Sequence, residues 1–195
     1  MARLRAKIAS GAMRVVQRAR VLWYSLLSTN GMQGVPMLCQ PMQLAGSGII
    51  RFDSNVRIGV FPSPGFLDGY AYIEARNPGA TVSFGSGTWI NNGFRCIAEH
   101  TSITIGADCL IGANVEIMDS DFHGLRLDER GMSRPEWAAP VVVEERVFIG
   151  SNVRILKGVR IGAGSVIANS SVVISDIPPM VVAAGVPAKA IRSIA

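Results

Sequence analysis

The chain has 195 residues, of which 49% are hydrophobic and 17% are charged, a balance that fits one folded domain and excludes an intrinsically disordered protein. Its net charge of +5 is unevenly distributed, because residues 1–52 carry seven Lys or Arg and no acid, whereas residues 53–195 carry 12 basic and 14 acidic residues. The body is therefore slightly acidic, which argues against a nucleic-acid-binding protein.

Residues 1–30 are predicted to form a basic amphipathic helical arm. Apolar residues recur there near helical spacing, interleaved with cations; they are Leu4, Ile8, Val15, Ala19, Leu22 and Leu26. No apolar run in the arm approaches the roughly 20 residues of a membrane span, and no convincing signal-peptide cleavage site follows it. Two locations for the arm stay open. The arm lies on an anionic lipid surface at the inner face of the membrane, or it packs on its own domain or on a neighbouring subunit of a cytoplasmic protein.

Residues 31–48 are expected to be a linker, and a six-residue repeat dominates the chain after it. One aliphatic residue recurs at every sixth position in two blocks: Ile105, Ile111 and Ile117, then Ile149, Ile155, Ile161, Ile167 and Val173. A period of six fits neither a helix nor a simple alternating strand. It fits a short strand followed by a tight turn, so that three repeats make a triangular coil and stacked coils bury a continuous core. This pattern predicts a parallel β-helix over residues 49–186.

The repeat is interrupted at MDSDFHG, residues 118–124, one of two places in the chain where a histidine occurs. Residues 122–140 are predicted to leave the β-helix as an inserted loop, a common location for functional residues on a rigid scaffold. His123 lies at the start of this loop, between Asp121 and the tryptophan Trp137. A neutral imidazole is suited to take a proton near pH 7. Residues 187–195, which follow a proline, are predicted to form a short C-terminal helix.

The repeats and the C-terminal segment resemble the hexapeptide-repeat acyltransferases, including the maltose, galactoside and cell-surface polysaccharide O-acetyltransferases. The resemblance covers residues 80–195 and rests on VFIGSNVRILKGVRIGAGSVIANSSVV and the ending IPPMVVAAGVPAKAIRSI. It implies a left-handed parallel β-helix, a homotrimer and acetyl-CoA as the acyl donor. It also implies an acceptor hydroxyl on a sugar of a cell-surface polysaccharide or its precursor.

The resemblance also implies roles for the residues around the break. His123 corresponds to the general base, which activates the hydroxyl for direct transfer without an acyl-enzyme. Asp119 or Asp121 could hold the imidazole tautomer, or both could simply form the turn. His100 falls where galactoside-type enzymes carry an acid that touches the acceptor, and Asn92 aligns with an asparagine of their acceptor pocket. Trp137 is expected in the loop that covers the site.

A second set of residues matches the family's CoA groove. Phe148 would lie beside the end of the pantetheine arm, and Gly150, Ser151, Ala168 and Asn169 along it. Lys189 and Arg192 match basic positions near the nucleotide phosphates, and their spacing of three places both on one face of the predicted helix.

Two other functions stay open at this stage: an amino-sugar N-acetyltransferase, and a non-catalytic β-helix assembly protein. No metal site is expected, because the chain has two histidines and three widely separated cysteines, which do not have the spacing of metal ligands.

Overall fold

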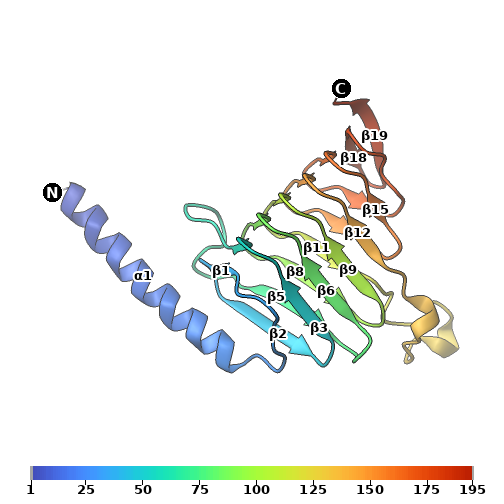
Figure 1. Ribbon diagram of the computed structural model, residues 1–195, viewed down its shortest axis with the longest axis horizontal. Coiled ribbons are helices and arrows are strands. Elements are labelled where there is room, and N and C mark those ends of the chain that lie inside the picture. The colour runs from blue at the N-terminus through green and yellow to red at the C-terminus, as the bar shows by residue number, and fades with distance from the viewer. Residues whose placement is uncertain (1, 195) are drawn as a thin grey trace.

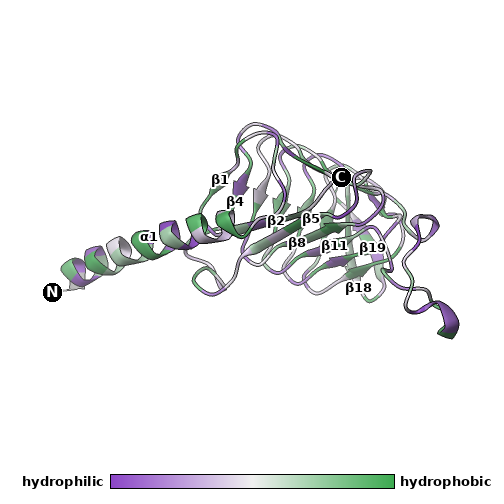
Figure 2. Cartoon of the chain, turned by 90° about the horizontal axis from the view of Figure 1, so that it is seen from below, coloured by the Kyte–Doolittle hydropathy of each residue, from purple (hydrophilic) through white to green (hydrophobic). Residues whose placement is uncertain are grey.

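The computed structural model describes residues 2–194, which form one long helix followed by a body of stacked β-coils. The helix α1 (Ala2–Leu26) projects from the base of the body, and the C-terminus lies at the opposite end (Figure 1). Figure 2 shows the same projection from below. Within residues 2–194, no helix is long and apolar enough to cross a membrane.

The strands form three sheets, which we name the first, second and third faces in the order in which the chain visits them. The first face consists of β1 (Met37–Leu38), β4 (Arg57–Ile58), β7 (Trp89–Ile90), β10 (Leu110–Ile111), β13 (Phe148–Ile149), β16 (Val166–Ile167), β18 (Val181–Gly185) and β19 (Ala188–Ser193). The second face consists of β2 (Met42–Gly46), β5 (Ala71–Ala75), β8 (Arg95–Ala98), β11 (Glu116–Met118), β14 (Arg154–Ile155) and β17 (Val172–Val173). The third face consists of β3 (Ile49–Phe52), β6 (Thr81–Phe84), β9 (Ser102–Ile105), β12 (Val141–Val143) and β15 (Arg160–Ile161).

The register of the strands confirms that three six-residue repeats make one coil. Ile149 pairs in parallel with Ile167, 18 residues further along the chain, and Ile155 pairs with Val173. The eight aliphatic repeat positions predicted to point inward are each at most 3% exposed. Alternate side chains of each strand therefore build the core, because successive side chains of a strand point to opposite faces.

Two expectations at the ends of the β-helix are wrong. The β-structure begins earlier than residue 49, because β1 and β2 fall inside the expected linker, residues 31–48. The expected C-terminal helix over residues 187–195 is instead the strand β19, which turns back at Gly185 and pairs antiparallel with β18. An unpaired final strand would expose a row of backbone donors and acceptors, and β19 satisfies those of β18.

The inserted loop lies at the corner between the second and third faces. The chain leaves after β11 and returns at β12, and the intervening loop contains two short 3₁₀ helices, η1 (Leu127–Glu129) and η2 (Pro135–Trp137). The loop projects sideways from the body (Figure 1). It therefore carries the residues around His123 outside the repeating coils.

Candidate functional site

His123 lies at the base of the inserted loop with an exposed side chain. Its Nδ1 is 2.8 Å from the backbone carbonyl oxygen of Arg130, on the opposite arm of the loop. A carbonyl oxygen can only accept a hydrogen bond, so this contact places the ring hydrogen on Nδ1 of the neutral imidazole. Nε2 then keeps its lone pair, and within residues 2–194 no polar partner occupies it. The contact with Arg130 therefore fixes one tautomer of the ring and leaves Nε2 able to accept a proton.

Asp119 does not hold the imidazole, contrary to one of the two expectations for it. Its side chain is fully buried, and its two carboxylate oxygens accept hydrogen bonds from the backbone amides of Glu99, His100 and Thr101 and from the Thr101 hydroxyl, at 2.7–3.2 Å. Asp119 therefore stabilises the preceding turn at the same corner, in the coil below. The partner of His123 is a backbone carbonyl, which leaves no signal in the sequence.

Asp121 contacts Lys157 and not the imidazole of His123. It accepts a hydrogen bond of 2.5 Å from Nζ of Lys157, which donates a second one of 2.6 Å to the carbonyl oxygen of Trp137. Lys157 thus ties both ends of the inserted loop to the next coil. Trp137 is half-buried at the end of the loop, with the Arg134 guanidinium 5.2 Å from its ring centroid.

A buried glutamate that sequence reasoning missed supports the turn leading to His123. Glu99 is 4% exposed and accepts a hydrogen bond of 2.6 Å from the Ser120 hydroxyl, whose oxygen accepts one of 3.0 Å from the Phe122 amide. Burial opposes ionisation of Glu99, but hydrogen bonds from Ser120, Ser133 and Arg76 outweigh it, so the pKa of the carboxyl lies below its ordinary value. The only sequence signal for a role of Glu99 is its position directly before His100.

His100 lies against the inserted loop. Its Nε2 is 3.5 Å from the Ser133 hydroxyl of the loop and 3.8 Å from a carboxylate oxygen of Glu99, while its Nδ1 is 3.1 Å from the Asn77 amide nitrogen. The structure therefore brings together His100 and the loop that carries His123.

Asn92 has a structural role that the sequence did not indicate. It is 1% exposed; its side-chain oxygen accepts from the Val60 amide, and its amide nitrogen donates to the carbonyls of Val60, Ser63 and Pro64. These bonds anchor the loop that follows β4. Asn92 also lies at the corner between the first and second faces, and thus at a different corner from His123. Its side chain is not available for an acceptor bound at this chain's own inserted loop.

The residues expected to bind CoA do gather in space. Phe148, on β13, is 46% exposed on the outer side of the first face. Gly150, Ser151, Ala168 and Asn169 follow it at the corner between the first and second faces, where Asn169 Oδ1 accepts from the Ser151 amide at 2.8 Å. A side chain at Gly150 would place its Cβ 2.4 Å from that oxygen, so the close approach of the two turns requires glycine.

Lys189 and Arg192 share one face of the molecule, although they lie on a strand and not on a helix. Residues three apart in a regular strand point to opposite sides. Here the register shifts by one residue, so that Lys189 lies opposite Ala184 and Arg192 opposite Val182. Such a bulge inserts one extra residue and shifts the alternation by one. Both cations therefore lie on the same side of the strand, exposed next to the outer side of the first face.

Comparisons with known proteins agree with this architecture. The family model "Bacterial transferase hexapeptide (six repeats)" matches residues 140–175, and "Hexapeptide repeat of succinyl-transferase" matches residues 102–120. The provisionally named lipopolysaccharide biosynthesis O-acetyl transferase WbbJ of Escherichia coli (strain K12) is 36% identical over 160 residues, which cover 78% of this chain and 76% of that protein. The chain belongs to the hexapeptide-repeat acyltransferase family.

The matches to three other relatives cover a smaller share of those proteins. The polysialic acid O-acetyltransferase of Escherichia coli O1:K1 is 40% identical over 114 residues, 58% of this chain and 37% of that protein. The chain likewise spans 55% and 58% of two yeast relatives, from Schizosaccharomyces pombe and Saccharomyces cerevisiae.

Two solved structures from the family are also similar to this fold. The crystal structure of the polySia-specific acetyltransferase NeuO has a TM-score of 0.58 and 31% identity, covering 82% of this chain and 71% of that one. VCA0836 from Vibrio cholerae, complexed with acetyl coenzyme A, has a TM-score of 0.50 and 26% identity, covering 95% and 88%.

The structure separates the two halves of the expected hexapeptide-repeat acyltransferase site. His123 and His100 lie at the corner between the second and third faces, whereas Gly150 and Asn169 lie at the corner between the first and second faces. A single chain therefore does not bring the expected base and the expected CoA groove to the same corner. Among residues 2–194, no three His, Cys, Asp or Glu side chains converge as a metal site would require.

Proposed function

We propose that the chain transfers an acetyl group from acetyl-CoA to a sugar hydroxyl of a cell-surface polysaccharide or its precursor. The observation that carries this proposal is the exposed imidazole of His123, with Nδ1 on the Arg130 carbonyl and Nε2 free. The names of the relatives support the choice of substrates, since they include a polysialic acid O-acetyltransferase and an acetyltransferase complexed with acetyl coenzyme A.

In the proposed reaction, Nε2 of His123 takes the proton of the acceptor hydroxyl while the oxygen attacks the thioester carbonyl carbon. The C–S bond then breaks, and the imidazolium returns the proton to the departing CoA thiolate, so the base is regenerated. A thioester is already activated, and no acyl-enzyme is needed. Cys96 and Cys109 are buried, and burial raises the pKa of each thiol, which makes both poor nucleophiles.

The CoA molecule would lie along the corner between the first and second faces. Lys189 and Arg192 would neutralise its phosphates, and Gly150 and Asn169 would line the pantetheine arm. This arrangement is supported by the exposure of both cations on one side of the first face.

We also propose a homotrimer of left-handed β-helices, in which a neighbouring subunit supplies the second half of each site. The separation of the two corners supports this assembly, and so does an exposed apolar row on the first face. Its members pair across adjacent coils and are 44–51% exposed: Trp89, Leu110 and Phe148. Such a row is a surface that a second copy would cover.

The test is a steady-state assay of His123→Ala with acetyl-CoA and a panel of glycan and amino-sugar acceptors. Loss of a general base should lower kcat by about 10² to 10⁴, while the affinity for CoA in calorimetry stays unchanged because the groove residues lie elsewhere. Full kcat in this variant would refute the role of His123. Transfer to amines alone would indicate an N-acetyltransferase, and no transfer by the wild type to any acceptor would indicate an assembly protein.

A further inference from the structure

The helix α1 contacts the body through polar side chains. Gln17 is 5% exposed, and its Nε2 donates a hydrogen bond of 2.6 Å to the carbonyl oxygen of Phe66. Arg20 donates one of 2.7 Å to the carbonyl oxygen of Gly69, in the same loop. Tyr24 packs its ring 4.6 Å from that of Tyr70. These three helix residues occupy one stripe of α1, which is the side that faces the body.

The opposite side of α1 is apolar and has nothing packed on it. At 3.6 residues per turn, its apolar residues lie roughly half a turn from Gln17; they are Leu4, Ile8, Val15 and Leu26, with exposures of 63–80%. An amphipathic helix that docks on its own domain turns its apolar side inward. Here the orientation is reversed, which excludes packing of this apolar side on the chain's own body.

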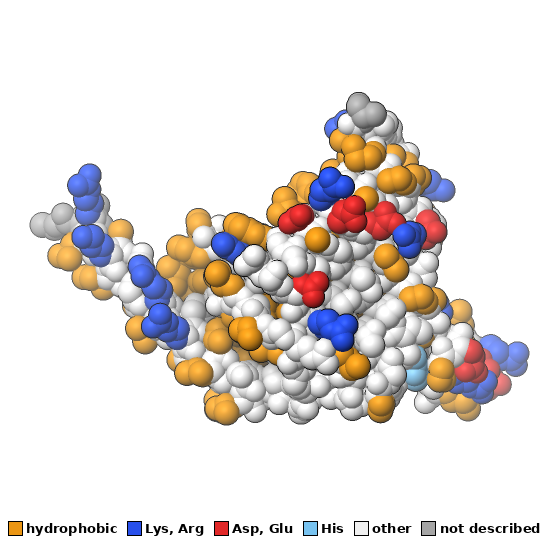
Figure 3. Space-filling model, in the orientation of Figure 1, with side chains coloured by type: hydrophobic (Ala, Val, Ile, Leu, Met, Phe, Trp, Pro, Cys, Tyr) orange, Lys and Arg blue, Asp and Glu red, His pale blue; other side chains and the backbone are white. Residues whose placement is uncertain are grey.

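Cations flank the apolar side and have no acid near them in the sequence. One row, Arg3, Lys7, Arg14 and Arg18, runs along one flank, and Arg5 lies on the other. Among the described residues, none of these five forms a salt bridge. The face of the molecule in Figure 3 shows the cations along α1 with no acidic side chain beside them.

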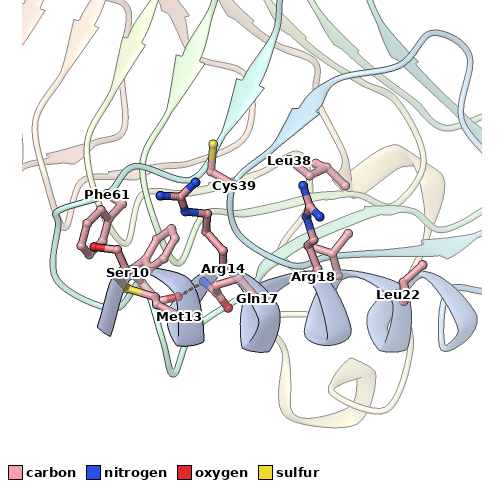
Figure 4. Close-up of a pocket in the computed structure, with 11 residues that line it drawn as sticks. Ser10, Met13, Arg14, Gln17, Arg18, Leu22, Leu38, Cys39 and Phe61 are labelled. Atoms are coloured by element: carbon pink, nitrogen blue, oxygen red, sulfur yellow. Dashed lines mark hydrogen bonds between the residues drawn. The ribbon is translucent and has the colours of Figure 1, made fainter. Parts of the chain in front are cut away.

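A groove separates the cationic flank of α1 from the body. It has a volume of about 650 Å³ and lies between α1 and the loop after β4, with Leu38 and Phe61 on the body side. Arg14 and Arg18 extend from α1 into it, and Figure 4 shows both guanidinium groups pointing toward Leu38 and Cys39. Long side chains in such an open position are free to turn toward phosphate groups beside the helix.

We propose that α1 binds the surface of an anionic membrane, with its outer apolar side in the acyl-chain boundary and its flanking cations on the lipid phosphates. This combination of an apolar face and a cationic flank is typical of helices that lie in the membrane interface. Charge decides against the helix of a second copy as the occupant. Packing these helices on one another would bring six cations from each, with no Asp or Glu in residues 1–52, into one contact.

The inference concerns a surface far from the inserted loop and does not depend on acetyl transfer. It does bear on the acceptor, because a membrane-bound enzyme would meet lipid-linked glycans at its own surface. α1 projects from the base of the body, at the opposite end from β18 and β19 (Figure 1). Binding through α1 therefore leaves the proposed phosphate site, Lys189 and Arg192, away from the lipid.

The experiment measures binding of the full-length protein to phosphatidylcholine vesicles with and without phosphatidylserine, by flotation at several salt concentrations. We expect binding only to the anionic vesicles, with a loss as salt rises. Replacing Arg3, Arg5 and Lys7 by Gln should weaken it about 100-fold, since each cation near such a surface contributes a factor of about five. The matched control replaces three cations of the body, Arg51, Arg95 and Arg154, by Gln and should bind like the wild type.

A second variant tests the apolar side. Ile8→Ser, Val15→Ser and Leu26→Ser together should weaken vesicle binding by about tenfold or more, while Val35→Ser, which removes another exposed apolar side chain, should not. The four substituted side chains are 63–85% exposed, so circular dichroism should be unchanged. Equal binding to neutral and anionic vesicles, or binding indifferent to the cation variant, would overturn the proposal. A fall in oligomeric mass without vesicles in the serine variant would also overturn it, because the apolar side would then be a contact between copies.

Discussion

Asp119→Asn separates the two roles that the sequence left open for this residue. If Asp119 oriented the general base, the substitution would act on kcat. If it stabilises the turn of the coil below, as its hydrogen bonds indicate, the substitution should act on stability and leave the chemical step largely intact.

The size of the stability loss follows from the hydrogen bonds. The carboxylate oxygen Oδ2 accepts from His100 N, Thr101 N and Thr101 Oγ1, and Oδ1 accepts from Glu99 N. An asparagine can keep its oxygen on the first three donors, but its amide nitrogen then faces the Glu99 amide, two donors against each other at a site with no solvent exposure. One charge-assisted bond lost and one buried donor left unpaired cost about 2–4 kcal/mol. For a domain of this size, the melting temperature should fall by about 5–15 °C.

The assay combines thermal unfolding at fixed protein concentration with kcat measured well below the transition. Asp121→Asn is the matched control, because Asp121 and Lys157 are each about one third exposed in side-chain area, and a surface ion pair contributes at most about 1 kcal/mol. A drop in kcat of about 10² or more with an unchanged melting temperature would refute the structural role of Asp119 and restore it as the partner of the base.

Three further predictions concern the cations expected to bind CoA, the side chain of Asn92 and the carboxyl group of Glu99. Lys189→Ala and Arg192→Ala should each raise KM for acetyl-CoA with kcat unchanged; a lower kcat at saturating acetyl-CoA would contradict the phosphate-binding role. Asn92→Ala should cost about 2–3 kcal/mol of unfolding free energy and expose residues 60–69 to limited proteolysis, whereas a change confined to acceptor KM would favour an acceptor-pocket role. The pKa of Glu99 is lowered, so its stabilising contribution is present above the ordinary value of about 4.3 and is lost as the pH falls through the lower folded value. Acid unfolding curves of wild type and Glu99→Gln should therefore converge at low pH, and parallel curves would contradict this account.

Much of the β-helix could be read from local periodicity. Ile149 and Ile167 were identified as inward residues because each repeat presents one aliphatic side chain at the same step of a strand and turn, and the register confirms their pairing. The earliest coils lack a clean repeat, so local periodicity predicts a linker where the structure has β1 and β2. At the candidate site, the sequence indicated the loop and His123 but not what orients the imidazole, since the Arg130 carbonyl is a backbone group that any residue could supply.

The sequence by itself determined the fold class and the place where the repeat is interrupted, because both depend on spacings of a few residues along the chain. Tertiary structure alone decided which partners the polar side chains find. Asn92 anchors a loop about 30 residues earlier in the chain, and α1 turns polar Gln17 toward the body and its apolar side away from it. The strand β19 likewise forms because the edge of β18 is open, a condition that does not exist until the last coil has stacked. Such contacts join segments far apart in sequence, and no local pattern encodes them.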